Sequence, residues 1–310
     1  MPSRPTDPLD GLTVLERGWL SSNNVLVHAA PGEAGALLVD TSHVNHREQT
    51  LALVRHALAG RPLALIANTH LHSDHSGGNA TLQAAFAAPL ALPPGQAEAV
   101  LRWDEAELSY HRTGQRIEPF RHQALLQPGE ALRAGGRDWE VIAAPGHDPH
   151  AVMLFDRAHG VLLSADALWH NGFGLVFPEL DGEDAFAEVG ATLDLIARLQ
   201  PLTVIPGHGG VFADVPEAIA RARRRLAGFE ADPVRHARYA AKVLLKYKLL
   251  EWQQAPLTQV HAWLAATPYY ARLHQRYFAD RMAGQWTEEL VQELIATGAA
   301  RREGKTLHNA

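Results

Sequence analysis

Apolar and polar residues alternate with a short period in the first part of the chain and with a helical period in the last part. Three apolar runs separated by turn-prone residues predict a meander of strands at residues 12–19, 24–29 and 36–41. Helical spacing of apolar residues follows over residues 45–58. The wholly apolar run at residues 63–67 is typical of a strand that is buried on both faces.

The same kind of pattern returns in the middle of the chain and then gives way to helices. Strands are predicted at residues 139–143, 152–155, 161–164 and 203–205, with a helix over residues 182–199. Helices are predicted at residues 233–252, 257–265, 268–281 and 286–296, followed by a small hairpin at residues 298–307. We therefore expect a first domain over residues 1–225 and a helical domain over residues 226–310, with the boundary near residues 222–230.

Composition narrows the classes of protein that this pattern allows. The chain has 310 residues, which exceeds one average domain, and its formal net charge of −6 argues against a chain-wide nucleic-acid binder. It contains no cysteine, so disulfides, cysteine-based zinc sites and a thiol nucleophile are excluded. The first twelve residues lack the apolar core of a signal peptide, and no apolar run reaches membrane-spanning length. We expect a cytoplasmic protein without a membrane partner.

Metal-competent side chains gather directly after the predicted strands. Four of them follow the strand at residues 63–67, and one more follows each of three later strands: His70, His72, Asp74, His75, His147, Asp166 and His208. Loop residues at strand ends are aimed by a rigid sheet at a common cleft. Packing so many imidazoles and carboxylates together is unfavourable unless a cation compensates them. The pattern therefore predicts a metal site built from histidine and aspartate.

Spacing divides the first four of these residues between two positions. Alternate residues of an extended segment point the same way, so His70 and His72 can share one metal ion. Asp74 and His75 lie past the turn and can reach a second position. The Gly77-Gly78 pair then lets the backbone bend tightly into the next helix.

The order and spacing of these motifs resemble the metallo-β-lactamase superfamily, and in particular its glyoxalase-II-like, binuclear branch. The resemblance covers Thr69-His70-Leu71-His72-Ser73-Asp74-His75, then Pro-Gly-His147, Ala-Asp166 and Pro-Gly-His208. It implies an α/β fold, a four-layer αβ/βα sandwich with the site at one edge between two sheets. It also implies that His70, His72 and His147 bind one metal ion, that Asp74, His75 and His208 bind the other, and that Asp166 bridges both. Asp40 matches a family position that lies behind the metal-binding residues.

Several positions depart from the family pattern. Asp148 and His150 follow the third motif where relatives often carry small residues, and the run at residues 169–174 replaces the usual loop. Whether His43, His150 and His170 face the cleft stays open. A helix within residues 88–130 is either a lid over the cleft or an ordinary surface helix. No cysteine ligand is present, which argues against antibiotic hydrolysis.

The resemblance implies a dinuclear metal-dependent hydrolase of a small ester, thioester or lactone. Two divalent ions, with Zn²⁺ favoured and Fe or Mn open, share a water and lower its pKa from near 16 towards roughly 7. Asp74 is expected to orient the hydroxide that bridges the ions. An iron-dependent persulfide oxygenase stays open, whereas a non-catalytic scaffold is disfavoured because all seven ligand positions are filled.

The helical region after residue 225 resembles the winged-helix-like domain of some relatives. Basic residues are dense between Arg221 and Leu250: Arg221, Arg223, Arg224, Arg225, Arg235, Arg238, Lys242, Lys246 and Lys248. Such a run is either a solvated helix face or a phosphate-binding stripe, so a metal-dependent endoribonuclease stays open as the alternative function. We expect a small-molecule substrate, while nucleic acid, as the less favoured partner, and a homodimer stay open.

Overall fold

The computed structural model describes residues 7–310, so the first six residues of the expected first domain lie outside the described part of the chain. The chain forms two compact units. The first comprises the chain up to Leu108 together with Ile117–Ala227, and the second comprises Ser109–Arg116 and Gly228–Ala310. The segment Ser109–Arg116 thus groups with the second unit, although it lies within the range expected for the first domain.

The first unit contains two stacked sheets. The six-stranded sheet has the order β1 (Leu12–Leu15), β2 (Asn24–Val27), β3 (Ala36–Val39), β4 (Leu63–Ala67), β5 (Leu90–Leu92), β6 (Ala124–Leu125). The five-stranded sheet has the order β11 (Thr203–Pro206), β10 (Val161–Ala165), β9 (Val152–Asp156), β8 (Arg137–Ala143), β7 (Ala131–Ala134). From β3 to β6 the first sheet is parallel, whereas β7 to β10 pair antiparallel.

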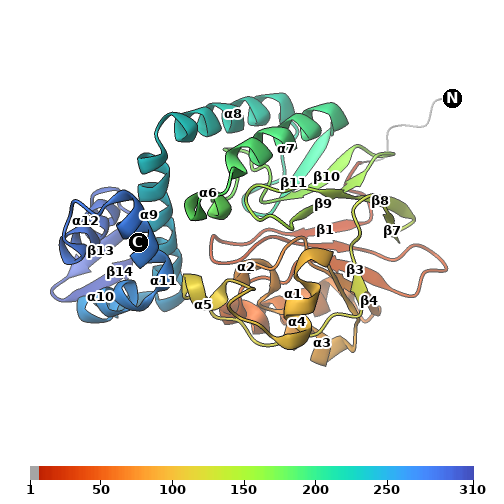
Figure 1. Cartoon of the computed structure of the whole chain (residues 1–310). Coiled ribbons are helices and arrows are strands. Elements are labelled where there is room, and N and C mark those ends of the chain that lie inside the picture. Colours follow the sequence, from red (N-terminus) through yellow and green to blue (C-terminus); the bar gives the residue numbers. More distant parts are fainter. Residues whose placement is uncertain (1–6) are drawn as a thin grey trace. The chain divides into compact units, whose positions relative to one another are not determined.

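Helices cover the outer face of each sheet (Figure 1). On the first sheet these include α1 (Arg47–Leu58), preceded by η1 (Val44–His46), and α3 (Asn79–Phe86), which packs beside α1. On the second sheet α7 (Ala185–Leu199) lies over the strands, after the short helix α6 (Phe177–Asp181). This arrangement confirms the predicted four-layer αβ/βα sandwich. The helix α8 (Val215–Ala231) follows β11 and ends beyond the border of the first unit.

The core of the first unit lies between the inner faces of the two sheets. Val25, Val39 and Ala67 from one sheet share a buried cluster with Trp139 and Leu154 from the other. Full burial of one Val or Leu side chain contributes about 1.5–3 kcal/mol, so this interface holds the strands rigidly. Rigid strands in turn fix the loops that leave their ends.

Some predicted elements have different bounds in the structure. Strand β1 stops at Leu15, because the chain leaves the sheet and exposes Trp19. The helix predicted over residues 182–199 begins at Ala185, since Gly182 adopts a left-handed conformation that ends α6.

The prediction of a single helix within residues 88–130 is wrong. This segment instead contains β5, η2 (Pro94–Gln96), α4 (Ala97–Arg102), α5 (Tyr110–Thr113) and β6. Left-handed backbone at Trp103, Ser109 and Gly114 interrupts the helical path. The segment is therefore not one helical lid.

The second unit is mainly helical, as predicted. It contains α9 (Pro233–Trp252), α10 (Leu257–Ala266), α11 (Pro268–Tyr277) and α12 (Ala283–Ala296), with a three-stranded antiparallel sheet in the order β12 (Gln254–Pro256), β14 (Thr306–Asn309), β13 (Ala300–Glu303). The hairpin expected at residues 298–307 corresponds to β13 and β14. The winged-helix-like resemblance stays a prediction. Among residues 7–310, every helix is too short or too polar to span a lipid bilayer.

Burial of one lysine explains why Ser109–Arg116 belongs to the second unit. Lys248 is buried, forms an ion pair with Glu251 at 2.9 Å, and donates a hydrogen bond to the carbonyl oxygen of Gly114 at 3.0 Å. The Trp263 ring packs directly on Gly114, where a Cβ atom would meet the indole nitrogen at 2.8 Å. A buried ammonium needs such partners, so these contacts hold the segment on α9 and α10.

Candidate metal centre

The HxHxDH motif leaves the sheet at the end of β4 and turns into the one-turn helix α2 (Ser73–Ser76). His72 is extended, with φ −60° and ψ 149°, whereas Asp74 and His75 lie within α2. The tight approach of this turn to its neighbours requires glycine. A Cβ atom at Gly77 would meet the Ser73 carbonyl oxygen at 2.5 Å, and one at Gly78 would meet the Thr41 carbonyl oxygen at 2.2 Å.

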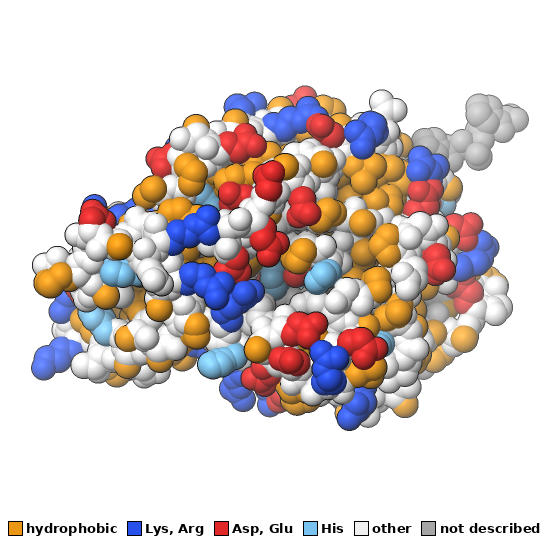
Figure 2. Space-filling view, viewed as in Figure 1, with side chains coloured by type: hydrophobic (Ala, Val, Ile, Leu, Met, Phe, Trp, Pro, Cys, Tyr) orange, Lys and Arg blue, Asp and Glu red, His pale blue; other side chains and the backbone are white. Residues whose placement is uncertain are grey.

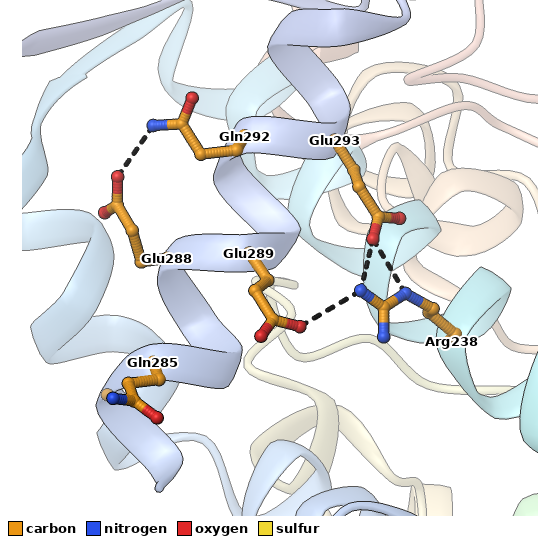
Figure 3. Close-up of a pocket in the computed structure, with 7 residues that line it drawn as sticks. Arg238, Gln285, Glu288, Glu289, Gln292 and Glu293 are labelled. Carbon is orange, nitrogen blue, oxygen red and sulfur yellow. Dashed lines mark hydrogen bonds and ion pairs between the residues drawn. The ribbon is translucent and has the colours of Figure 1, made fainter. Parts of the chain in front are cut away.

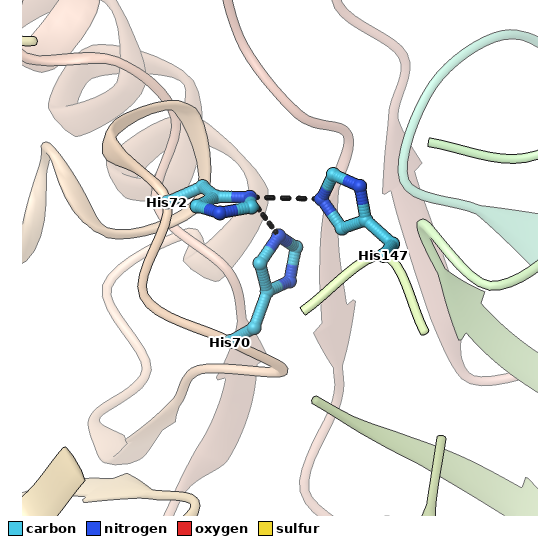
Figure 4. Close-up of side chains that lie close together, drawn as sticks. All are labelled: His70, His72 and His147. Carbon is cyan, nitrogen blue, oxygen red and sulfur yellow. Dashed lines mark hydrogen bonds between the residues drawn. The ribbon is translucent and has the colours of Figure 1, made fainter. Parts of the chain in front are cut away.

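Three histidines converge in a first group (Figure 4). The Nδ1 atom of His72 lies 2.8 Å from Nε2 of His147 and 3.1 Å from Nε2 of His70. The Nδ1 atom of His147 donates a hydrogen bond to the Leu175 carbonyl oxygen at 2.6 Å. Because a carbonyl oxygen can only accept, this bond places a proton on Nδ1 and turns Nε2 of His147 toward the group.

A second group contains Asp74, His75 and His208. The Oδ2 atom of Asp74 lies 3.0 Å from Nε2 of His208 and 3.8 Å from Nε2 of His75. On its other side, the His75 ring donates from Nδ1 to Oδ2 of Asp40 at 2.7 Å. The Nε2 atom of His75 is buried without a hydrogen-bond partner and faces the carboxylates of Asp74 and Asp166, so a cation bound there would displace a proton from this atom.

Asp166 lies between the two groups and faces both. Its Oδ2 atom is 3.4 Å from Nε2 of His147 in the first group. Its Oδ1 atom is 3.4 Å from Nε2 of His75 and 3.9 Å from Nε2 of His208 in the second. The indole nitrogen of Trp169 donates a hydrogen bond to Oδ1 at 3.1 Å. One buried carboxylate therefore contacts both groups with different oxygen atoms.

Charges within the centre shift the pKa values of its members in opposite directions. Burial and the neighbouring imidazole of His147 lower the pKa of His72 to about 4. Burial and the surrounding imidazoles also lower the pKa of His70 well below its ordinary value. Burial alone would lower the pKa of His75, but the carboxylates of Asp40, Asp166 and Asp74 raise it well above its ordinary value. Burial opposes ionisation of Asp74, yet the nearby His75 and His208 hold its pKa at about 2.

These features fit divalent cations. Two ionised, buried carboxylates and five inward-facing imidazoles form a donor set with nitrogen and oxygen atoms within 4.8 Å of one another in each group. The Nε2 atom of His75, which has no hydrogen-bond partner, faces the carboxylates of both Asp74 and Asp166. Imidazole and carboxylate donors suit zinc, iron and manganese alike. Most ring nitrogens that face away are held by protein atoms, an arrangement typical of metal-binding histidines.

The remaining sequence candidates lie outside these groups. Asp40 is buried behind His75, as the resemblance implied. His43 is buried and accepts a hydrogen bond from the backbone of Asn45. The exposed ring of His150 lies against Gly95, and His170 pairs with Asp214 at 3.0 Å. Neither His43, His150 nor His170 therefore joins the ligand groups.

Aromatic side chains beside the centre were not assigned from the sequence. Phe177 presents its ring to His72 and His147, with centroid distances of 5.1 Å and 5.9 Å. Trp19 and Trp169 contact His208 on the other side. Trp169 could have been found from its position three residues after Asp166. Trp19 could not, because it lies far from every motif in the sequence.

Comparisons with known proteins bear on this centre. The family model described as "Metallo-beta-lactamase superfamily" matches residues 17–208, which include every member of both groups. The chain belongs to the metallo-β-lactamase superfamily. Acyl-coenzyme A thioesterase MBLAC2 of Gallus gallus is 32% identical over 167 residues, covering 49% of this chain and 58% of that protein. The chain thus spans little more than half the length of this relative.

Other known proteins are similar over longer stretches. A hydroxyacylglutathione hydrolase of Polaromonas sp. (strain JS666) is 28% identical over 215 residues, covering 67% of this chain and 71% of that protein. The crystal structure of a metallo-β-lactamase family protein from Thermus thermophilus covers 98% of this chain and 100% of that chain, with 22% identity and a TM-score of 0.59, which shows the shared fold. A structure of TTHA1623 in a di-iron-bound form is 26% identical and covers 67% of this chain and 96% of that chain, with a TM-score of 0.51.

Close packing beside the carboxylate of Asp166 leads to a testable prediction. A Cβ atom at Gly207 would lie 2.2 Å from Oδ1 of Asp166, so Gly207→Ala must displace that carboxylate. We expect the affinity for Zn²⁺, measured by competition with a chelator, to fall about 10-fold or more. Gly210→Ala, whose Cβ atom would meet Glu16 only at 3.5 Å, is the matched control and should bind Zn²⁺ as the wild type does. Unchanged affinity in Gly207→Ala would show that Asp166 does not contribute to metal binding.

Proposed function

We propose that the chain is a binuclear metal-dependent hydrolase of small esters, thioesters or lactones, with acyl thioesters as the favoured class. The observation that carries this proposal is the position of Asp166, whose two carboxylate oxygens face two separate ligand groups. The relative from Gallus gallus is an acyl-coenzyme A thioesterase, which favours a thioester as the substrate of this chain.

In this proposal, His70, His72 and His147 hold one divalent ion, Asp74, His75 and His208 hold the other, and Asp166 contacts both. When bound, such ions supply an acidified water and electrostatic stabilisation of the oxyanion that develops on the substrate. The low pKa of His72 keeps its ring neutral near pH 7, so its nitrogen lone pair is free to bind. Zn²⁺ is the proposed metal.

We propose that Asp74 orients the attacking water. Its side chain is 13% exposed, against 6% for that of Asp166, so of the two carboxylates it is the more open to solvent. Its pKa of about 2 keeps it ionised and able to accept a hydrogen bond at neutral pH. Asp40 supports this arrangement by accepting the Nδ1 proton of His75, which keeps Nε2 of that ring turned to the centre.

The endoribonuclease alternative gains no support from the basic residues of α8 and α9. Five of the nine lie beside acidic partners: Arg221 contacts Asp214, Arg223 contacts Asp194, Lys242 contacts Glu293, Lys248 contacts Glu251, and Arg238 lies between Glu289 and Glu293 (Figure 3). Figure 2 shows basic and acidic side chains interspersed on the face in view. Paired cations have less charge to offer a phosphate backbone, so a small substrate is favoured over RNA.

The test combines metal content with a substrate panel. Purified chain loaded with Zn²⁺ is expected to hydrolyse chromogenic thioesters and to leave a single-stranded RNA intact. His72→Ala should lose kcat/KM on every thioester by about 10³-fold, because a ligand of the first group is removed. His56→Ala, which removes an exposed histidine of α1, is the matched control and should retain activity. Cleavage of RNA without thioester hydrolysis would overturn the proposal.

A further inference from the structure

Two tryptophans form a continuous aromatic surface with one histidine of the candidate centre. The Trp19 ring stacks on the His208 ring at a centroid distance of 5.4 Å and an angle of 11°. Trp169 packs edge-on against both, at 5.5 Å from Trp19 and 5.2 Å from His208. We call the rings of Trp19 and Trp169 the aromatic face.

The aromatic face remains open to solvent. Trp19 is 61% exposed, whereas Trp169 is partly buried and His208 is buried beneath them. A single exposed aromatic residue is common on protein surfaces and needs no explanation. Here, however, the exposed ring is stacked on a member of the candidate centre, so any group that covers it also lies beside that centre. An indole offers a large, rigid apolar surface that favours stacking with a planar partner.

The loop at residues 169–174 is held in place by a bond within the turn and by two contacts from α8. The Trp169 amide donates to the Gly172 carbonyl oxygen at 2.7 Å, which closes the turn. From α8, the Arg221 Nε atom donates to the His170 carbonyl oxygen at 2.7 Å, and the Arg225 guanidinium lies 5.5 Å from the centroid of the Phe173 ring. Part of the basic run on α8 therefore positions this loop.

The same loop also acts on the bridging carboxylate. The indole N–H of Trp169 donates to Oδ1 of Asp166 at 3.1 Å, and the Gly174 amide donates to the Asp166 carbonyl oxygen at 2.8 Å. A hydrogen bond to one carboxylate oxygen fixes the orientation of the carboxylate and the direction of the other oxygen. Phenylalanine at position 169 would keep the ring but could not make this bond.

We propose that Trp169 is a positioning residue for Asp166 and that the aromatic face determines specificity by stacking on a planar, apolar group of the substrate. The specificity part rests on the proposed hydrolase function, whereas the positioning part concerns metal binding alone. Favoured substrates are then thioesters with an aromatic group on either the acyl side or the thiol side. Purely aliphatic thioesters lose this contact.

The first experiment compares S-benzyl thioacetate and S-ethyl thiobenzoate with S-ethyl thioacetate. For Trp19→Ala we expect kcat/KM on at least one aromatic substrate to fall about tenfold, mainly through a higher KM. On S-ethyl thioacetate the loss should be clearly smaller, so that the preference for aromatic over aliphatic substrates falls. Leu202→Ala, which removes a 67% exposed apolar side chain elsewhere in the first unit, is the matched control. Equal losses on all three substrates, or no loss on either aromatic one, would overturn the specificity role.

The second experiment does not depend on turnover. We expect Trp169→Phe to bind Zn²⁺ about tenfold more weakly in competition with a chelator, while keeping the wild-type preference for aromatic substrates. Wild-type affinity in Trp169→Phe would overturn the positioning role.

A third measurement separates this inference from the proposed reaction. The Zn²⁺-loaded wild type should bind benzyl mercaptan more tightly than ethanethiol, as measured by indole fluorescence, and Trp19→Ala should lose this difference. If the wild type hydrolyses no thioester but shows this preference, the proposed function fails and the aromatic face stands. If the wild type hydrolyses thioesters but binds both thiols equally, the proposed function stands and the aromatic face fails.

Discussion

Asp166→Asn is expected to lower kcat/KM on thioesters by about 10³-fold or more and to reduce the bound metal below the wild-type content. The asparagine side chain has nearly the same shape, so packing around it is kept. It carries no charge, however, and one of its two terminal atoms donates hydrogen bonds instead of accepting them. In the wild type, both oxygens face imidazole nitrogens, at 3.4 Å from His147 and from His75. Elemental analysis and steady-state kinetics on the same preparation provide the measurement.

The control for this change is an aspartate with no contact to the centre. Asp194 is 58% exposed and pairs with Arg223 on the helical surface. Asp194→Asn should therefore keep wild-type metal content and activity, since exposed ion pairs contribute only about 0–1 kcal/mol. Full metal content and activity in Asp166→Asn would contradict the assignment of Asp166 as the shared ligand.

Asp40→Asn is expected to weaken both the fold and the metal centre. The buried carboxylate accepts three hydrogen bonds, from the Thr69 amide at 2.9 Å, from its hydroxyl at 2.8 Å and from Nδ1 of His75 at 2.7 Å. An amide nitrogen in place of one oxygen would face a donor. We expect the free energy of unfolding to fall by about 1–3 kcal/mol and the Zn²⁺ affinity to fall about 10–100-fold.

Asparagine is the informative substitution at this position because Asp40 has a left-handed backbone, with φ +58°. Asparagine tolerates that conformation, whereas most other residues would add backbone strain. Denaturant unfolding of the metal-free protein separates the loss of stability from the loss of metal. Asp138→Asn, at an exposed pair with Arg133, should change the free energy of unfolding by less than about 0.5 kcal/mol. The same small change in Asp40→Asn would show that its hydrogen bonds are not important for stability.

Local pattern was sufficient to predict where the centre forms. Apolar runs of strand length ended just before each candidate ligand, and the structure places β4, β8, β10 and β11 at those runs. A strand places its side chains alternately on two faces, so the apolar pattern shows which segments enter a sheet. The seven candidate residues do converge, and Asp40 lies behind them.

The long-range partners of these residues could not be predicted in the same way. Trp19 and His208 are far apart in the sequence, and nothing near either residue indicates that their rings stack. The segment Ser109–Arg116 joins the second unit through Lys248, a contact that likewise leaves no local trace. The basic run on α8 and α9 suggested a phosphate-binding stripe, but its acidic partners come mainly from other elements.

The sequence by itself determined the strand ends and the candidate ligands that follow them, because side-chain direction in strands and helices follows from local periodicity, and its resemblance to a known family implied the fold class. The tertiary structure decided which oxygen of Asp166 faces which group, which donor holds that carboxylate, and which rings cover His208. These contacts depend on how two sheets and their loops stack in three dimensions. Stacking distances are set by the packing of the whole core, so no short stretch of sequence contains them.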